Sequence, residues 1–162
     1  MKPSDLLALL DELYRDKLAL RQRHVAAARH VDHYDFNNTY QYVIAREDMH
    51  LAWLRAALAD LGGTPATVPE PHLTASGRGE SALQGILRDY VQMASAFVEK
   101  WNDRLDGITN ARDLKMCQVV LGETMEHRRF FEQALAGDDT LLGRRTGGAS
   151  TGGGVLPVRW VE

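Results

Sequence analysis

Apolar residues recur every three or four positions along most of this chain, which is the spacing of residues on one face of an α-helix. Four stretches show this spacing: one from Ser4 into the sequence HVDHYD, and the ranges 35–61, 81–105 and 110–136. No stretch has the strict alternation of apolar and polar residues that indicates a β-strand. The pattern therefore predicts an all-α fold with four long helices.

Residues with strong local preferences mark the predicted helix ends. Ser4 is a good N-cap for the first helix, and Asp5 suits the positive end of the helix dipole. Gly62 and Gly63 are expected to stop the second helix. Asn110 is expected to cap the fourth helix.

The segment 62–80 separates two pairs of predicted helices. It contains three prolines and four glycines, so it is expected to be a linker. Nineteen extended residues reach about 60 Å, and a helix of 25 residues is about 37 Å long. The linker can therefore run the full length of a bundle, which permits an antiparallel four-helix bundle made of two helical hairpins joined by a crossover. Residues 1–137 are predicted to form this one domain.

The last 25 residues, 138–162, differ in composition from the predicted bundle. Their Gly/Ser/Thr-rich part is typical of a flexible linker. The final sequence VLPVRWVE is again apolar and aromatic. This end is expected either to fold back onto the bundle or to dock on a protein partner.

The overall composition restricts the class of protein. The chain has 162 residues, of which 44% are hydrophobic and 25% charged, and this is typical of one globular domain. The net charge of −3 does not favour nucleic acid or an anionic membrane as a partner. Cys117 is the only cysteine, which excludes an internal disulfide. No apolar run is long enough for a membrane span and no convincing signal peptide is present, so a cytoplasmic location is expected.

Two polar residues lie on the apolar face of the second predicted helix. At 100° per residue, Glu47 falls in the middle of that face and His50 falls on its shoulder. A carboxylate buried alone is costly unless it is paired or binds a metal ion. An inward-facing Glu and His three residues apart could present an oxygen and a nitrogen to one cation.

The other predicted helices offer partners for Glu47. Asp16 lies at the matching height on the first helix. His127 sits on the shoulder of the fourth helix, as His50 does on the second. Thr124 takes the central position there, and Glu123 lies on the same edge as His127.

The arrangement of helices and the motif Glu47-x-x-His50 resemble the ferritin-like superfamily, which includes ferritins and rubrerythrins. The resemblance implies a metal centre in the bundle core holding iron or manganese, with a role in oxygen or peroxide chemistry or in iron handling. It also implies a homodimer or a higher homo-oligomer. The metal ligands that it implies are Asp16, Glu47, His50, Glu123 and His127.

Two further hypotheses are open, one for the same core residues and one for the C-terminal tail. Arg128 lies near the centre of the apolar face of the fourth helix, and a Glu47–Arg128 pair would give a structural or interaction bundle without metal. Alternatively, the C-terminal peptide after its glycine-rich linker resembles that of a cargo protein packaged in an encapsulin shell. The sequence assigns neither a substrate nor catalytic residues.

Overall fold

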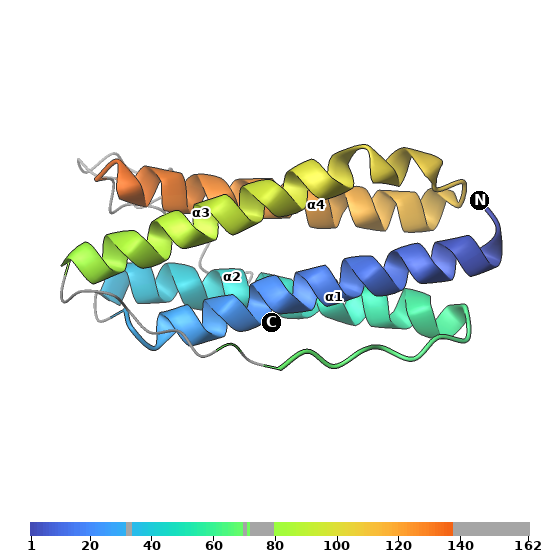
Figure 1. The fold of residues 1–162 in the computed structure, drawn as a ribbon, viewed down its shortest axis with the longest axis horizontal. Coiled ribbons are helices and arrows are strands. Elements are labelled where there is room, and N and C mark those ends of the chain that lie inside the picture. Colours follow the sequence, from blue (N-terminus) through green and yellow to red (C-terminus); the bar gives the residue numbers. More distant parts are fainter. Residues whose placement is uncertain (32–33, 70, 72–79, 138–162) are drawn as a thin grey trace, which may run out of the picture.

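The computed structural model describes residues 1–31, 34–69, 71 and 80–137, and it places them in a bundle of long helices (Figure 1). Within these ranges there is no β-strand, so the predicted all-α class is confirmed. The predicted C-terminal tail lies outside the described residues. The elements are α1 (Pro3–Ala28), α2 (Tyr34–Asp60), α3 (Glu80–Asn102), the short 3-10 helix η1 (Arg104–Gly107) and α4 (Ala111–Leu135).

The four helices form two closely packed pairs. The helix α1 packs chiefly against α2, and α3 packs chiefly against α4. The pairs then meet with α1 beside α3 and α2 beside α4. Figure 1 shows that α2 ends at one end of the molecule, whereas α3 begins at the other. The end of α2 and the start of α3 are therefore separated by the length of the bundle.

Ion pairs fix the register between the two helix pairs. Between α1 and α3, Glu12 pairs with Lys100 and Arg23 pairs with Asp89, so the paired residue numbers rise along α1 as they fall along α3. The helices α2 and α4 follow the same rule, through the pairs Arg46–Glu123 and Asp60–Arg112.

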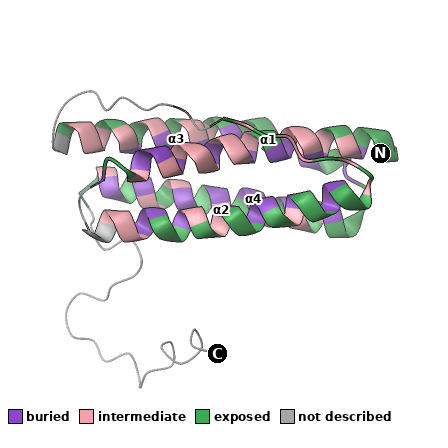
Figure 2. Ribbon diagram, turned by 90° about the horizontal axis from the view of Figure 1, so that it is seen from below, coloured by how far each residue is buried: buried purple, intermediate pink, exposed green. Residues whose placement is uncertain are grey.

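The core is built from one continuous face of each helix. Buried residues repeat at alternating spacings of three and four, which keeps them on one side of an α-helix. Figure 2 shows this division, with exposed residues on the outer sides of the helices. On α1 the repeat is Leu6, Leu10, Leu13, Lys17, Leu20, His24 and Ala27; on α4 it is Asp113, Cys117, Val120, Thr124, His127, Phe131 and Ala134.

The helix starts agree only in part with the predicted signals. Asn110 caps α4 as expected, because its side chain accepts hydrogen bonds from the backbone N–H groups of Arg112 and Asp113. The prediction that Ser4 caps α1 is wrong. The helix begins at Pro3, whose fixed φ suits the first helical position, and Lys2 precedes it without a side-chain cap.

The end of α2 depends on the two glycines that follow it. Gly62 has a φ of +76°, a conformation that side-chain-bearing residues rarely adopt. The N–H of Gly63 donates to the carbonyl of Leu58 at 2.8 Å, which satisfies a carbonyl of the last turn. The chain then turns onto α1, where Gln22 donates to the carbonyl of Val68.

No helix among the described residues is both long and apolar enough to cross a membrane.

Candidate functional site

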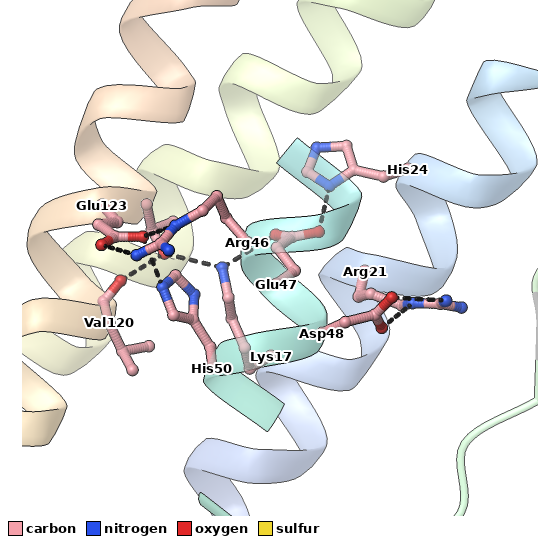
Figure 3. A network of polar contacts seen from close by, with 10 residues as sticks. Lys17, Arg21, His24, Arg46, Glu47, Asp48, His50, Val120 and Glu123 are labelled. Atoms are coloured by element: carbon pink, nitrogen blue, oxygen red, sulfur yellow. Dashed lines mark hydrogen bonds and ion pairs between the residues drawn. The ribbon is translucent and has the colours of Figure 1, made fainter. Parts of the chain in front are cut away.

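A lysine lies in the centre of the bundle core. Lys17 extends from α1, and its side chain is completely buried. Its Nζ donates to Glu47 Oε1 on α2 at 2.9 Å and to Thr124 Oγ1 on α4 at 2.8 Å. The Thr124 hydroxyl in turn donates to the carbonyl of Val120 at 2.7 Å. The ammonium therefore links three helices at one point (Figure 3).

Glu47 is held by two basic side chains from α1. Its second oxygen, Oε2, lies 2.5 Å from Nδ1 of His24. Burial alone would raise the pKa of Glu47, but the charges of His24 and Lys17 outweigh burial and lower it to about 2. The buried carboxylate is therefore ionised at neutral pH. The sequence prediction that Glu47 occupies the core is confirmed, since its side chain is not exposed.

A second polar cluster joins α2 and α4 nearer the surface. His50 Nε2 lies 2.8 Å from Glu123 Oε2. The guanidinium of Arg46 holds both oxygens of Glu123, with Nε 2.9 Å from Oε2. Burial opposes ionisation of Glu123, but the hydrogen bonds from Arg46 and His50 lower its pKa. Arg46 and Glu123 remain partly exposed, so this cluster lies between the buried lysine and solvent.

Two neutral histidines complete the polar core. The rings of His50 and His127 are stacked with centroids 6.3 Å apart. Burial and the nearby charge of Lys17 lower the pKa of His50 to about 4 and that of His127 to about 3. Both rings are therefore neutral at pH 7. The Nδ1 atoms of both are buried and have no hydrogen-bonding partner in the part of the chain that the structure describes.

Asp16, the carboxylate predicted on the first helix, does not join this site. It faces α3, where its Oδ2 accepts from Lys100 Nζ at 2.7 Å and from Trp101 Nε1 at 2.9 Å. Its side chain is 31% exposed. The predicted height on α1 is right, but Lys17 is the inward residue there, because adjacent helical positions point about 100° apart.

The alternative partner Arg128 is also placed elsewhere. Its Nε lies 3.2 Å from Glu132 Oε1, one turn along α4. The prediction of a Glu47–Arg128 pair is therefore wrong, and the charge that meets Glu47 comes from α1 instead. The side chain of Arg128 is 27% exposed although its Nε is buried, so this arginine lies at the edge of the apolar face and extends along its own helix toward Glu132.

The residues present do not fit a two-metal carboxylate centre. Such a centre needs carboxylates converging from several helices, whereas Asp16 faces α3 and Thr124 offers only a hydroxyl. The ammonium of Lys17 fills the position beside Glu47 and Thr124. Over the ranges that the structure describes, no three His, Cys, Asp or Glu side chains are grouped so that they could hold a metal ion.

The spacing of buried residues along the first helix indicates that Lys17 faces the core, although its charge suggests a position on the surface. Lys17 falls four residues after Leu13 and three before Leu20, so it lies within the three-and-four repeat of buried residues. A lysine in that position must either extend outward or meet an anion. Pairing it with the inward-facing Glu47 would have identified the site.

Comparison with protein-family models, with curated proteins and with solved structures gives no significant match to this chain. The fold and the polar core are therefore the basis for any proposal about the class of this protein.

Proposed function

We propose that this chain is an antiparallel four-helix bundle of the ferritin-like type, with the α2–α3 connection as its crossover. The register of ion pairs between α1 and α3 and between α2 and α4 supports this arrangement. The positions of the two ends of the α2–α3 connection support it as well.

We further propose that it acts as a structural or interaction bundle whose core carries a built-in cation, rather than as a metal-dependent oxidoreductase. The observation that carries this proposal is the contact of Lys17 Nζ with both Glu47 and Thr124. An ammonium with these two partners supplies the positive charge that the buried carboxylate requires. Because the lysine is covalently part of α1, this partner is present beside Glu47 whenever the chain is folded.

Metal analysis of the purified full-length protein tests this proposal. We expect no stoichiometric iron or manganese in the wild type. We also expect that added Fe²⁺ or Mn²⁺ leaves the thermal unfolding midpoint unchanged, because ligand binding to the native state would raise it. One or two ions per chain, lost on the substitution Glu47→Gln, would contradict the proposal.

A second candidate keeps one metal ion at the α2–α4 interface, bound by the Nδ1 atoms of His50 and His127, with Glu123 as the carboxylate that orients His50. The observation that favours it is the pair of buried, unpartnered Nδ1 atoms on two neutral histidines. The contact between His50 Nε2 and Glu123 is also the kind that orients metal-binding imidazoles. This candidate predicts one ion per chain, removed by His127→Ala but retained in Glu47→Gln, so the same measurements separate the two functions.

A further inference from the structure

The helix α2 carries a second apolar stripe on the side facing away from the core. All six of its residues are exposed to solvent, including Tyr42 at 42% and Met49 at 44%. The stripe consists of Tyr42, Ala45, Met49, Ala52, Ala56 and Ala59.

The spacing of this stripe is that of a coiled-coil seam. Its residues alternate between steps of three and four over the range 42–59, which is the heptad pattern of a helix that packs along another helix. At 100° per residue they span about 100° and lie opposite the buried face that contains Val43, Glu47 and Leu54. A helix with apolar residues on two opposite sides needs a partner on each side.

Nothing in the described part of the chain covers this stripe. The segment after α2 lies along α1 instead, where Gly63 approaches Leu7 and Val68 accepts from Gln22. Tyr42 contacts α4 through T-shaped ring contacts with His127 and Phe130, at centroid distances of 6.2 Å and 6.3 Å, and is still 42% exposed. Within the described ranges, the outer side of α2 is therefore open over a length of about 25 Å.

We propose that the outer face of α2 is a homodimer interface, in which the α2 helices of two copies pack antiparallel about a twofold axis between Met49 and Ala52. Twofold dimers are the commonest assemblies, and such an interface brings the same patch of both copies together. The proposal is independent of how the carboxylate of Glu47 is neutralised.

Side-chain size favours the antiparallel register. About this axis, Tyr42 faces Ala59 of the second copy, Met49 faces Ala52, and Ala45 faces Ala56. Every large side chain thus meets a small one, which lets two helices interdigitate without voids or clashes. A parallel pairing in register would instead place Tyr42 against Tyr42 and Met49 against Met49.

The charges that flank the stripe are complementary in the same register. Asp48 and Arg55 lie on one edge of the seam, at positions that set orientation in coiled coils. In the antiparallel pair, Asp48 of one copy and Arg55 of the other differ by about 3 Å in height along the helix axes. The twofold symmetry generates this contact twice. Asp48 already pairs with Arg21, and its side chain is still 53% exposed.

Sedimentation analysis of the full-length protein tests the interface. We expect the wild type to sediment with the mass of two chains and Met49→Glu with the mass of one, with unchanged helix content by circular dichroism. Met125→Glu is the matched control, since Met125 is 42% exposed on α4 away from the seam, and it should remain dimeric. A monomeric wild type, or a dimer that survives Met49→Glu, would overturn the proposal.

Charge reversal tests the antiparallel register. Asp48→Arg and Arg55→Asp should each weaken self-association, because each places like charges opposite one another twice. An equimolar mixture of the two variants should recover the dimer, since the mixed pair restores both opposite-charge contacts. Failure of the mixture to associate more strongly than either variant alone would rule out this register.

Discussion

The ammonium of Lys17 and the carboxylate of Glu47 form an ion pair with 2.9 Å between Nζ and Oε1, and neither side chain is exposed to solvent. Two charges in such a place are costly to desolvate, so their effect on stability depends on keeping both.

Removing the lysine alone should strongly destabilise the fold. Lys17→Met leaves Glu47 buried with a thioether in place of the ammonium and with His24 as its remaining basic partner. Breaking a buried ion pair in this way costs about 3–5 kcal/mol. The free energy of unfolding in urea measures the loss. The matched control is Arg112→Ala, which removes the exposed pair with Asp60 and should cost less than about 1 kcal/mol.

Neutralising both partners should recover much of that loss. In the double variant Lys17→Met with Glu47→Gln both charges of the ion pair are removed together, so we expect higher stability than for Lys17→Met alone. Equal stability of the double and single variants would show that the ion pair is not the origin of the effect.

Acid should destabilise the protein in two stages. The pKa values of His50 and His127 fall from 6.5 to about 4 and about 3, so below pH 6.5 the unfolded chain binds more protons than the native one. Stability is therefore fully present above pH 6.5 and declines as the pH falls toward 3. Glu47 adds a further loss between pH 4.5 and about 2, because its lowered pKa makes the native state resist protonation.

Unfolding free energies measured between pH 7.5 and pH 4.5 isolate the histidine stage. The double variant His50→Gln with His127→Gln should show a flatter pH dependence there than the wild type, whatever its stability at pH 7.5. An unchanged slope would mean that other groups carry the dependence.

Three glycines should respond to alanine in opposite directions. A Cβ on Gly63 would meet Leu7 Cδ1 at 2.5 Å and the carbonyl of Leu58 at 3.2 Å. Overpacking of this kind costs about 1–3 kcal/mol, so Gly63→Ala should lower the thermal unfolding midpoint. Gly85 and Gly122 lie in helices with open space around them, and alanine there should stabilise by up to about 1 kcal/mol. A stabilising Gly63→Ala would contradict the close approach of the linker to α1.

Asp16 should matter little to stability or to metal content. Its partners Lys100 and Trp101 lie at the partly exposed α1–α3 surface, and asparagine keeps an oxygen that can accept from Trp101. We expect Asp16→Asn to cost about 1 kcal/mol or less in urea unfolding. A loss as large as that of Lys17→Met would mean that Asp16 takes part in the core network.

Much of the local structure could be predicted from the sequence. A helix face that is buried must repeat with the helical period. The alternating spacing of Leu6, Leu10 and Leu13, and the same spacing in three other stretches, therefore predicts the four helices. The same rule placed Glu47 and His50 in the core. The glycines after α2 and the cap at Asn110 followed from backbone conformation and from unsatisfied N–H groups.

Only the tertiary structure decided which cation meets Glu47. Periodicity gives the angle of a residue about its own helix, but the rotation and height of the neighbouring helices depend on how all four pack together. Asp16 and Lys17 are adjacent in sequence, yet one faces α3 and the other reaches Glu47, because 100° of rotation separates them. Arg128 lies near the apolar face of α4 and still turns to Glu132. The sequence thus determined that a buried carboxylate needs a positive charge. The packing of α1 against α2, which carries Lys17 to Glu47, determined that this lysine supplies it.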